Sequence, residues 1–210
     1  VSESTRTATF TPGRDAARKE ASKLNVPRIG VRFRLPASMN QVEYFGRGPA
    51  ENYLDRNAGS MVGLYKSTAE ELYFPYVRPQ ENGHHTDTRW VSLSTGKKGL
   101  LIQADNTIGF NALRNSIEDF DDEEATGLSR QWSNFTPEQV ANHDEAAAKN
   151  VLRRQHHINN ITPRDFVEVC VDLKQQGVAG YDSWGSRPEP AYTLPANREY
   201  NWGFTLIPLK

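Results

Sequence analysis

Three carboxylate side chains lie in settings where Glu or Asp can do chemistry: Glu51 in GPAENY, Glu81 in RPQENG and Asp182 in GYDSWG. A glycosidase uses two carboxyl groups roughly 5–10 Å apart, so these three are candidates for such a pair. The alternative is structural, because carboxylates in polar turns accept hydrogen bonds from loop amides or pair with arginines. The arginines available for this role are Arg47, Arg56, Arg78 and Arg89. We favour the structural interpretation.

Trp184 is a stronger functional signal than the carboxylates. The C–H groups of a sugar ring pack on an aromatic face, while its hydroxyls need polar neighbours. Trp184 meets both needs, since Asp182, Ser183 and Gly185 surround it in a loop of small and polar residues. The local sequence alone leaves ligand contact and core packing equally open for this indole.

The histidines and the single cysteine are weaker signals. Two adjacent histidine pairs occupy positions 84–85 and 156–157. Adjacent side chains diverge on a helix or strand, so neither pair has the i, i+4 spacing of a helical metal site, and we interpret them as structural or surface residues. Cys170 lies in a partly alternating run and is predicted to be a small buried hydrophobe in a strand. A single cysteine excludes an intramolecular disulfide.

Composition limits the class of protein. The 210 residues carry 25 Lys and Arg against 26 Asp and Glu, so charge-driven binding to nucleic acid or a membrane surface is not expected. Apolar runs are far shorter than the ~18 residues that cross a bilayer, which predicts a soluble chain. An eight-stranded α/β barrel of ~250 residues hardly fits this length. The chain begins with Val, which indicates an excised or processed piece and leaves cytoplasm and periplasm open.

Predicted strands must position these side chains. Apolar, β-branched and aromatic residues recur in short runs bounded by turn signals, as in a mainly β protein. The runs cover residues 7–11, 29–35, 42–45, 89–93, 100–104, 166–173 and 200–207. Trp90 and Trp202 lie in such runs and are expected in the core. We predict a single β-sandwich domain over residues 1–210.

One region breaks the β pattern. Thr136 can cap a helix, Pro137 suits the first helical turn, and residues 138–149 are rich in helix formers. We therefore predict a helical or loop insertion at about 121–152. Its acidic run, 121–124, has no defined ligand spacing and is interpreted as a solvated loop in preference to a metal site.

Four motifs, in order along the chain, carry a family resemblance. They are PRIGVRF (27–33), VEYFGRGPAENYLDR (42–56), YVRPQENG with TDTRW (76–90) and GVAGYDSWG (177–185). Together they resemble the C-terminal "small chain" domain, domain 5, of glycoside hydrolase family 2 β-galactosidases. The resemblance covers nearly the whole chain from about residue 26. It implies an antiparallel β-supersandwich of the galactose-mutarotase type, appended after a catalytic α/β barrel.

The resemblance also implies that catalysis and part of the substrate binding are carried by different domains. The catalytic glutamates of such retaining enzymes come from the barrel, so it implies no catalytic residue and no metal ligand in this chain. It assigns substrate binding to Trp184, with Asp182 and Ser183 beside it. The implied partners are a β-galactoside such as lactose and the barrel domain of the same protein, with a homo-oligomer possible for the full-length enzyme. No cofactor is implied for this chain, and Mg²⁺ or Na⁺ would serve the parent enzyme.

Three departures from the family pattern stand near these motifs. Ala179 and Tyr181 occupy positions where the family usually has Gly and Asp, and Leu54 replaces a usual Pro. Tyr181 beside Trp184 is expected to reshape the aromatic rim.

An alternative function needs no barrel. The chain would then be an autonomous carbohydrate-binding module or a mutarotase-like protein, in which a His and a Glu open the sugar ring by acid/base catalysis. His84, His85 and Glu81 are close in sequence and keep this alternative open.

Overall fold

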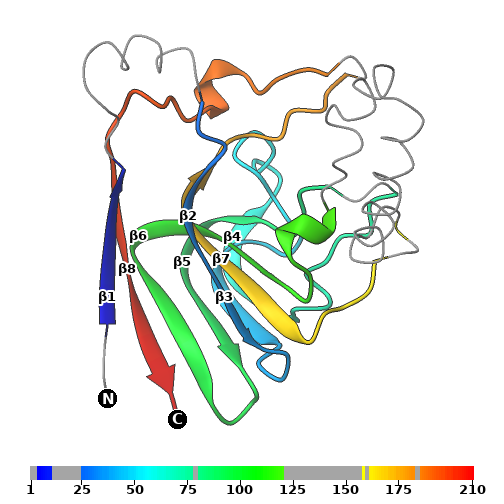
Figure 1. Cartoon of the computed structure of the whole chain (residues 1–210), viewed down its shortest axis with the longest axis vertical. Coiled ribbons are helices and arrows are strands. Elements are labelled where there is room, and N and C mark those ends of the chain that lie inside the picture. The colour runs from blue at the N-terminus through cyan, green and yellow to red at the C-terminus, as the bar shows by residue number, and fades with distance from the viewer. Residues whose placement is uncertain (1–3, 11–24, 78–79, 121–157, 159–160, 183–184) are drawn as a thin grey trace, which may run out of the picture.

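The computed structural model describes residues 4–10, 25–77, 80–120, 158, 161–182 and 185–210. These residues form eight strands and two short 3-10 helices (Figure 1). The strands are β1 (Ser4–Phe10), β2 (Arg28–Pro36), β3 (Gln41–Gly48), β4 (Met61–Thr68), β5 (His85–Ser94), β6 (Gly99–Leu113), β7 (Phe166–Gln175) and β8 (Tyr200–Leu209). The helices are η1 (Ile117–Phe120) and η5 (Pro190–Tyr192). The predicted mainly β class is confirmed.

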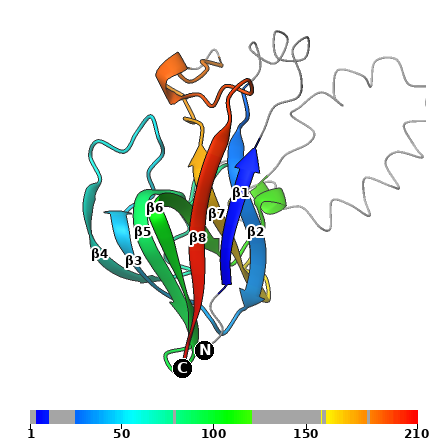
Figure 2. The same cartoon turned by 90° about the vertical axis from the view of Figure 1, so that its left-hand side faces the viewer.

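All strand pairs are antiparallel and belong to one connected sheet. The main path runs β1-β8-β6-β5-β3-β4, while β7 pairs with both β6 and β2. The long strand β6 joins these parts, because residues 99–104 pair with β8 and residues 109–113 pair with β7 (Figures 1 and 2).

The inner face of the sheet is apolar because successive side chains of a strand point to opposite faces and the apolar ones point inward. Tyr44 on β3 pairs with Val91 on β5, which pairs with Ile102 on β6, and all three are fully buried. Side chains from β3, β5, β6, β7 and β8 join them in one cluster. The predicted core position of Trp202 is confirmed, since only 8% of it is exposed.

The outer face carries the neighbouring residues of the same strands. Phe45 pairs with Leu64 on one side and with Trp90 on the other, and cross-strand partners share a face. Phe45 is 37% exposed and Leu64 is 59% exposed. Trp90 is therefore half-buried on the outer face, and its predicted core position is wrong. Its neighbour Val91 takes the inward position.

The structure adds strand residues that the sequence pattern did not predict. The sequence pattern does not predict strand β4. This strand lies at the edge of the sheet and has no fully buried residue, and its apolar residues Met61, Val62 and Leu64 are exposed. Strand β6 continues to Leu113, past polar residues 105–107 where the predicted strand had ended. The predicted helix and the insertion at 121–152 lie outside the described residues. Within the described part of the chain, no helix is long and apolar enough to cross a membrane.

Candidate functional site

Three loops that carry the sequence motifs meet at one end of the sheet. The first, residues 49–56, follows β3; the second, residues 74–83, precedes β5; the third, residues 176–186, follows β7. We call this meeting point the motif junction. Side chains of the first two loops hold it together, as the following contacts show.

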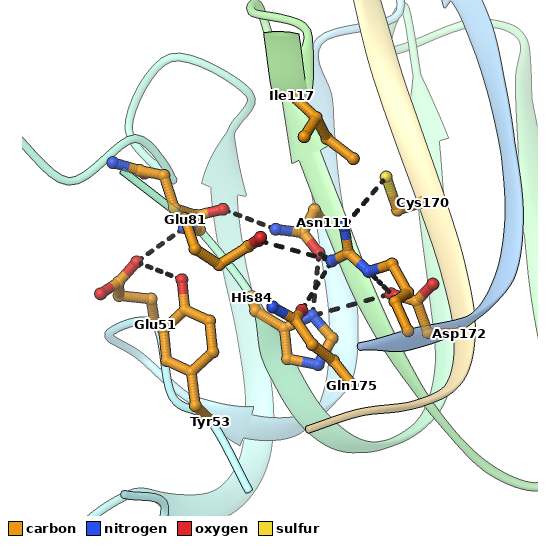
Figure 3. Close-up of polar contacts among 12 residues, drawn as sticks. Glu51, Tyr53, Glu81, His84, Asn111, Ile117, Cys170, Asp172 and Gln175 are labelled. Atoms are coloured by element: carbon orange, nitrogen blue, oxygen red, sulfur yellow. Dashed lines mark hydrogen bonds and ion pairs between the residues drawn. The ribbon is translucent and has the colours of Figure 1, made fainter. Parts of the chain in front are cut away.

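Glu51 joins the first loop to the second. Its carboxylate is only 3% exposed. It accepts hydrogen bonds from the Gly83 backbone N–H at 2.6 Å and the Tyr53 hydroxyl at 3.1 Å (Figure 3). The Arg56 guanidinium donates to it at 2.6 Å. The Tyr76 hydroxyl donates to the same carboxylate. The structural interpretation of Glu51 is confirmed, with both a loop amide and an arginine as partners.

Two asparagine side chains also hold these loops, because they form hydrogen bonds with backbone N–H and C=O groups. Asn52 accepts from the Thr86 N–H at 3.0 Å and donates to the Ala50 carbonyl at 3.1 Å. Asn82 accepts from the Phe74 N–H at 2.8 Å and donates to the Phe74 carbonyl at 2.6 Å. Buried backbone groups need such partners, so these amides fix the loop shapes.

Asp55 joins the first loop to the third. Its two carboxylate oxygens accept hydrogen bonds from the backbone N–H of Val178 at 3.1 Å and of Ala179 at 2.7 Å. A Cβ at Gly177 would lie 2.4 Å from Asp55 Oδ2, so the glycine leaves room for this contact. Ala179 has a φ of 53° and Gly180 a φ of 85°, both in the left-handed region. The glycine that the family resemblance implies at position 179 would suit this backbone conformation.

The predicted substrate-binding residues divide between the described and the undescribed parts. Asp182 is exposed, and its Oδ1 accepts a hydrogen bond from the Ser186 N–H at 3.2 Å. Asp182 thus accepts a loop hydrogen bond, as the structural interpretation expects, and its role in substrate binding stays a prediction. Tyr181 is 62% exposed beside it. Trp184 and Ser183 lie outside the described residues, so their role in binding stays a prediction.

An open groove of about 650 Å³ lies at the motif junction. Its lining mixes aromatic, charged and amide groups with exposed backbone. The lining residues are Pro27, Tyr53, Arg56, Tyr76, Gln80, Glu81, Gln175, Gln176, Gly177, Val178, Ala179, Gly180 and Pro188. Pockets of ~300–1,000 Å³ hold small molecules, so this groove has room for a sugar.

A buried ion network that the sequence pattern missed lies behind the groove (Figure 3). Arg28 donates to Asn111 Oδ1 at 2.6 Å and to Gln175 Oε1 at 2.7 Å, and its Nε lies 3.1 Å from Asp172 Oδ2. Glu81 Oε1 is 3.5 Å from the same guanidinium, which is not one of the arginines expected for it. Burial raises the pKa of Asp172 to about 7, although Arg28 opposes that rise. The signal for this network in the sequence was Asp172, a charged residue inside the apolar run of β7.

Both histidines of the 84–85 pair are enclosed. His84 is 1% exposed and His85 is 0% exposed. Burial lowers the pKa of His84 to about 3 and that of His85 to about 4, so both rings are neutral at pH 7. Nδ1 of His84 lies 2.8 Å from Asn111 Oδ1, and the pocket that reaches this ring holds about 40 Å³. Such a pocket is too small for a sugar, so the geometry does not support ring opening by these histidines.

The remaining candidates are structural or undescribed. Cys170 is 3% exposed on β7, and burial raises its pKa to about 12, which confirms the prediction of a buried strand residue. The described residues contain no group of three or more His, Cys, Asp or Glu side chains that could hold a metal ion. The other histidines and the acidic run 121–124 lie outside the described part.

Fold and site together define a mainly antiparallel β domain with a polar groove built from three loops at one end. Comparison with known proteins then identifies the family. The family model described as beta-galactosidase small chain matches residues 3–206. The chain belongs to this family.

Individual relatives agree with the family model. The chain is 35% identical to a β-galactosidase of Priestia megaterium over 185 residues, which is 88% of this chain and 15% of the relative. It is 40% identical to a β-galactosidase of an Arthrobacter species over 111 residues, 50% of this chain and 11% of the relative. It is 29% identical to a β-galactosidase of Vibrio cholerae over 181 residues, 86% of this chain and 14% of the relative. The chain thus spans about 15% of the length of the first of these relatives.

Proposed function

We propose that this chain is the C-terminal domain of a retaining β-galactosidase that hydrolyses terminal β-D-galactosides such as lactose. The domain completes the mouth of the active site, and Trp184 packs against the sugar next to the galactose. The catalytic glutamates belong to a barrel domain of the same protein. The 210-residue chain by itself is expected to hydrolyse no lactose.

The observation that carries this proposal is the anchored third loop. Asp55 accepts two backbone hydrogen bonds from residues 178 and 179, six and five positions before Trp184. The loop therefore leaves the sheet in a defined direction at the edge of the polar groove. An indole can contact a ligand with little loss of conformational freedom only when its loop is already held in place.

Replacement of Trp184 by alanine in the full-length enzyme tests the proposal. Stacking of a ring on an aromatic side chain contributes about 1–3 kcal/mol, so binding of lactose or of an acceptor sugar should weaken about 5- to 150-fold. Trp184→Tyr, which keeps an aromatic face, should retain part of the affinity. Phe45→Ala, which removes an exposed ring from the outer face of β3, is the matched control. Unchanged lactose kinetics in Trp184→Ala would exclude the stacking role.

The size of the groove keeps a second candidate function open, an autonomous sugar site. Its volume of about 650 Å³ and its amide and carboxylate lining suit a neutral sugar without a partner domain. Titration calorimetry of the 210-residue chain with galactose and with lactose separates the two functions. Binding in the millimolar range or tighter would favour the autonomous module, whereas no heat of binding favours a domain that needs the barrel.

A further inference from the structure

We propose that Asp55 is a positioning residue of the β-galactosidase: its carboxylate holds the backbone at residues 178 and 179 and thereby orients the loop that carries Trp184. This inference rests on the proposed function, because it matters for catalysis only if Trp184 contacts the substrate. Asp55 itself need not touch the sugar. Its effect passes through the backbone of the third loop.

The geometry of Asp55 suits a clamp. Its two oxygens each accept one N–H, from the consecutive residues Val178 and Ala179, at 3.1 and 2.7 Å. Hydrogen bonds to a carboxylate are stronger than those between neutral groups. Gly177 leaves room for the close approach, because a Cβ there would lie 2.4 Å from the carboxylate and one of the two would have to shift.

The backbone of the turn needs an external partner. Ala179 has a φ of 53°, a conformation that costs energy for a residue with a Cβ. Its N–H is one of the two that Asp55 accepts. The carboxylate therefore stabilises the left-handed conformation at Ala179.

Asp55 is itself held firmly, as a clamp must be. The Arg56 N–H donates to the Tyr53 carbonyl at 2.9 Å, which closes a turn around Asp55. Glu51 binds both Tyr53 and Arg56 through their side chains. The start of the third loop is held by a separate contact, since the Gly177 N–H donates to the Tyr192 carbonyl at 2.8 Å. Loss of Asp55 would therefore free one side of the loop and leave its base closed.

The test is Asp55→Asn in the full-length enzyme, with lactose as the substrate. Asparagine keeps the shape of the aspartate side chain. Its NH₂ group replaces one carboxylate oxygen, however, and cannot accept the hydrogen bond of a backbone N–H. We expect KM for lactose to rise about tenfold, with a smaller change in kcat and with the enzyme still folded by thermal melting. Asp105→Asn, a change at an exposed position of β6, is the matched control and should leave both constants unchanged.

Gly177→Ala provides a second and independent variant. It leaves the Asp55 carboxylate intact but inserts a methyl group where the structure has 2.4 Å to Oδ2. It should reproduce the rise in KM even if Asp55→Asn folds poorly. If Asp55→Asn and Gly177→Ala both melt at a lower temperature but keep the wild-type KM, the contact has a purely structural role. That result would overturn the inference.

A double-mutant cycle with Trp184→Ala separates this inference from the proposed function. If Asp55 acts through Trp184, Asp55→Asn should raise KM much less in the Trp184→Ala background than in the wild type. Equal effects in both backgrounds would overturn the role of Asp55 while leaving the role of Trp184 intact. Unchanged kinetics in Trp184→Ala alone would instead reject the proposed function.

Discussion

The sheet and the motif junction are held together by different forces. Inside the sheet, Tyr44, Val91, Ile102 and Phe110 are fully buried among other apolar side chains. At the junction, loops without regular strand pairing are held by carboxylates and amides that accept backbone N–H groups, with Glu51 and Asp55 as the main acceptors.

The difference shows why the most recognisable motifs of this chain are polar. Burial of apolar surface has no preferred direction, so many residues of similar size can fill a sheet interior. A loop is fixed only when particular donors and acceptors meet at hydrogen-bond distance. The side chains of ENYLDR and ENG satisfy that need, and their spacing is therefore distinctive.

The largest loss of stability is expected from the sheet side of this comparison. Phe110→Ala removes a fully buried ring that packs against Tyr44 and His85, with centroids 5.0 and 5.1 Å away. The free energy of unfolding should fall by about 3–5 kcal/mol. Urea denaturation followed by tryptophan fluorescence measures this change. A loss below about 1 kcal/mol would show that the sheet is not a well-packed core.

Glu51→Ala is the corresponding change at the junction. It removes the acceptor of four donors and leaves the buried Gly83 N–H and Tyr53 hydroxyl without this partner. We expect a loss of about 2–4 kcal/mol in urea denaturation. Glu51→Gln keeps one carbonyl oxygen and should lose less. Equal stability of wild type and Glu51→Ala would refute the view that the junction depends on polar contacts.

A pH experiment sharpens the comparison, because His85 lies where the two regions meet. The folded-state pKa of His85 is lowered to about 4 from the ordinary 6.5, so below pH 6.5 the unfolded chain binds a proton that the folded chain does not. Stability therefore falls with decreasing pH, by about 1 kcal/mol for this group at pH 5.5.

His85→Asn lacks this titration and provides the measurement. Its unfolding free energy should change about 1 kcal/mol less than that of the wild type between pH 7.5 and 5.5. Parallel curves for the two proteins would mean that His85 is accessible to protons in the folded state.

The smallest effect is expected on the outer face of the sheet. Leu64 on the edge strand β4 is 59% exposed, so Leu64→Thr should change the unfolding free energy of this chain by no more than about 0.5 kcal/mol. The same urea denaturation measures it, with Phe110→Ala as the reference for a buried position. A loss above about 1.5 kcal/mol would place Leu64 in a packed environment.

Much of the fold follows from local pattern, and the exceptions have physical causes. Residues 29–35 and 166–173 alternate or run apolar, and both form strands. Strand β4 escaped prediction because its apolar residues face outward, and Trp90 was assigned to the core because period-two alternation does not say which face is buried. For the site, local composition predicted that Glu51 and Asp182 would accept loop hydrogen bonds.

The amino-acid sequence was sufficient to predict the mainly β class, the family and the burial of Cys170, because each depends on residues close together in the chain or on long ordered motifs. Which motifs touch depends on the tertiary structure. Asp55 and Ala179 are 124 positions apart, and their contact depends on how β3 and β7 are placed in the sheet. Arg28 and Asp172 likewise meet only through the pairing of β2 with β7. Such contacts arise from strand register and loop closure over the whole chain, which no local pattern of residue types contains.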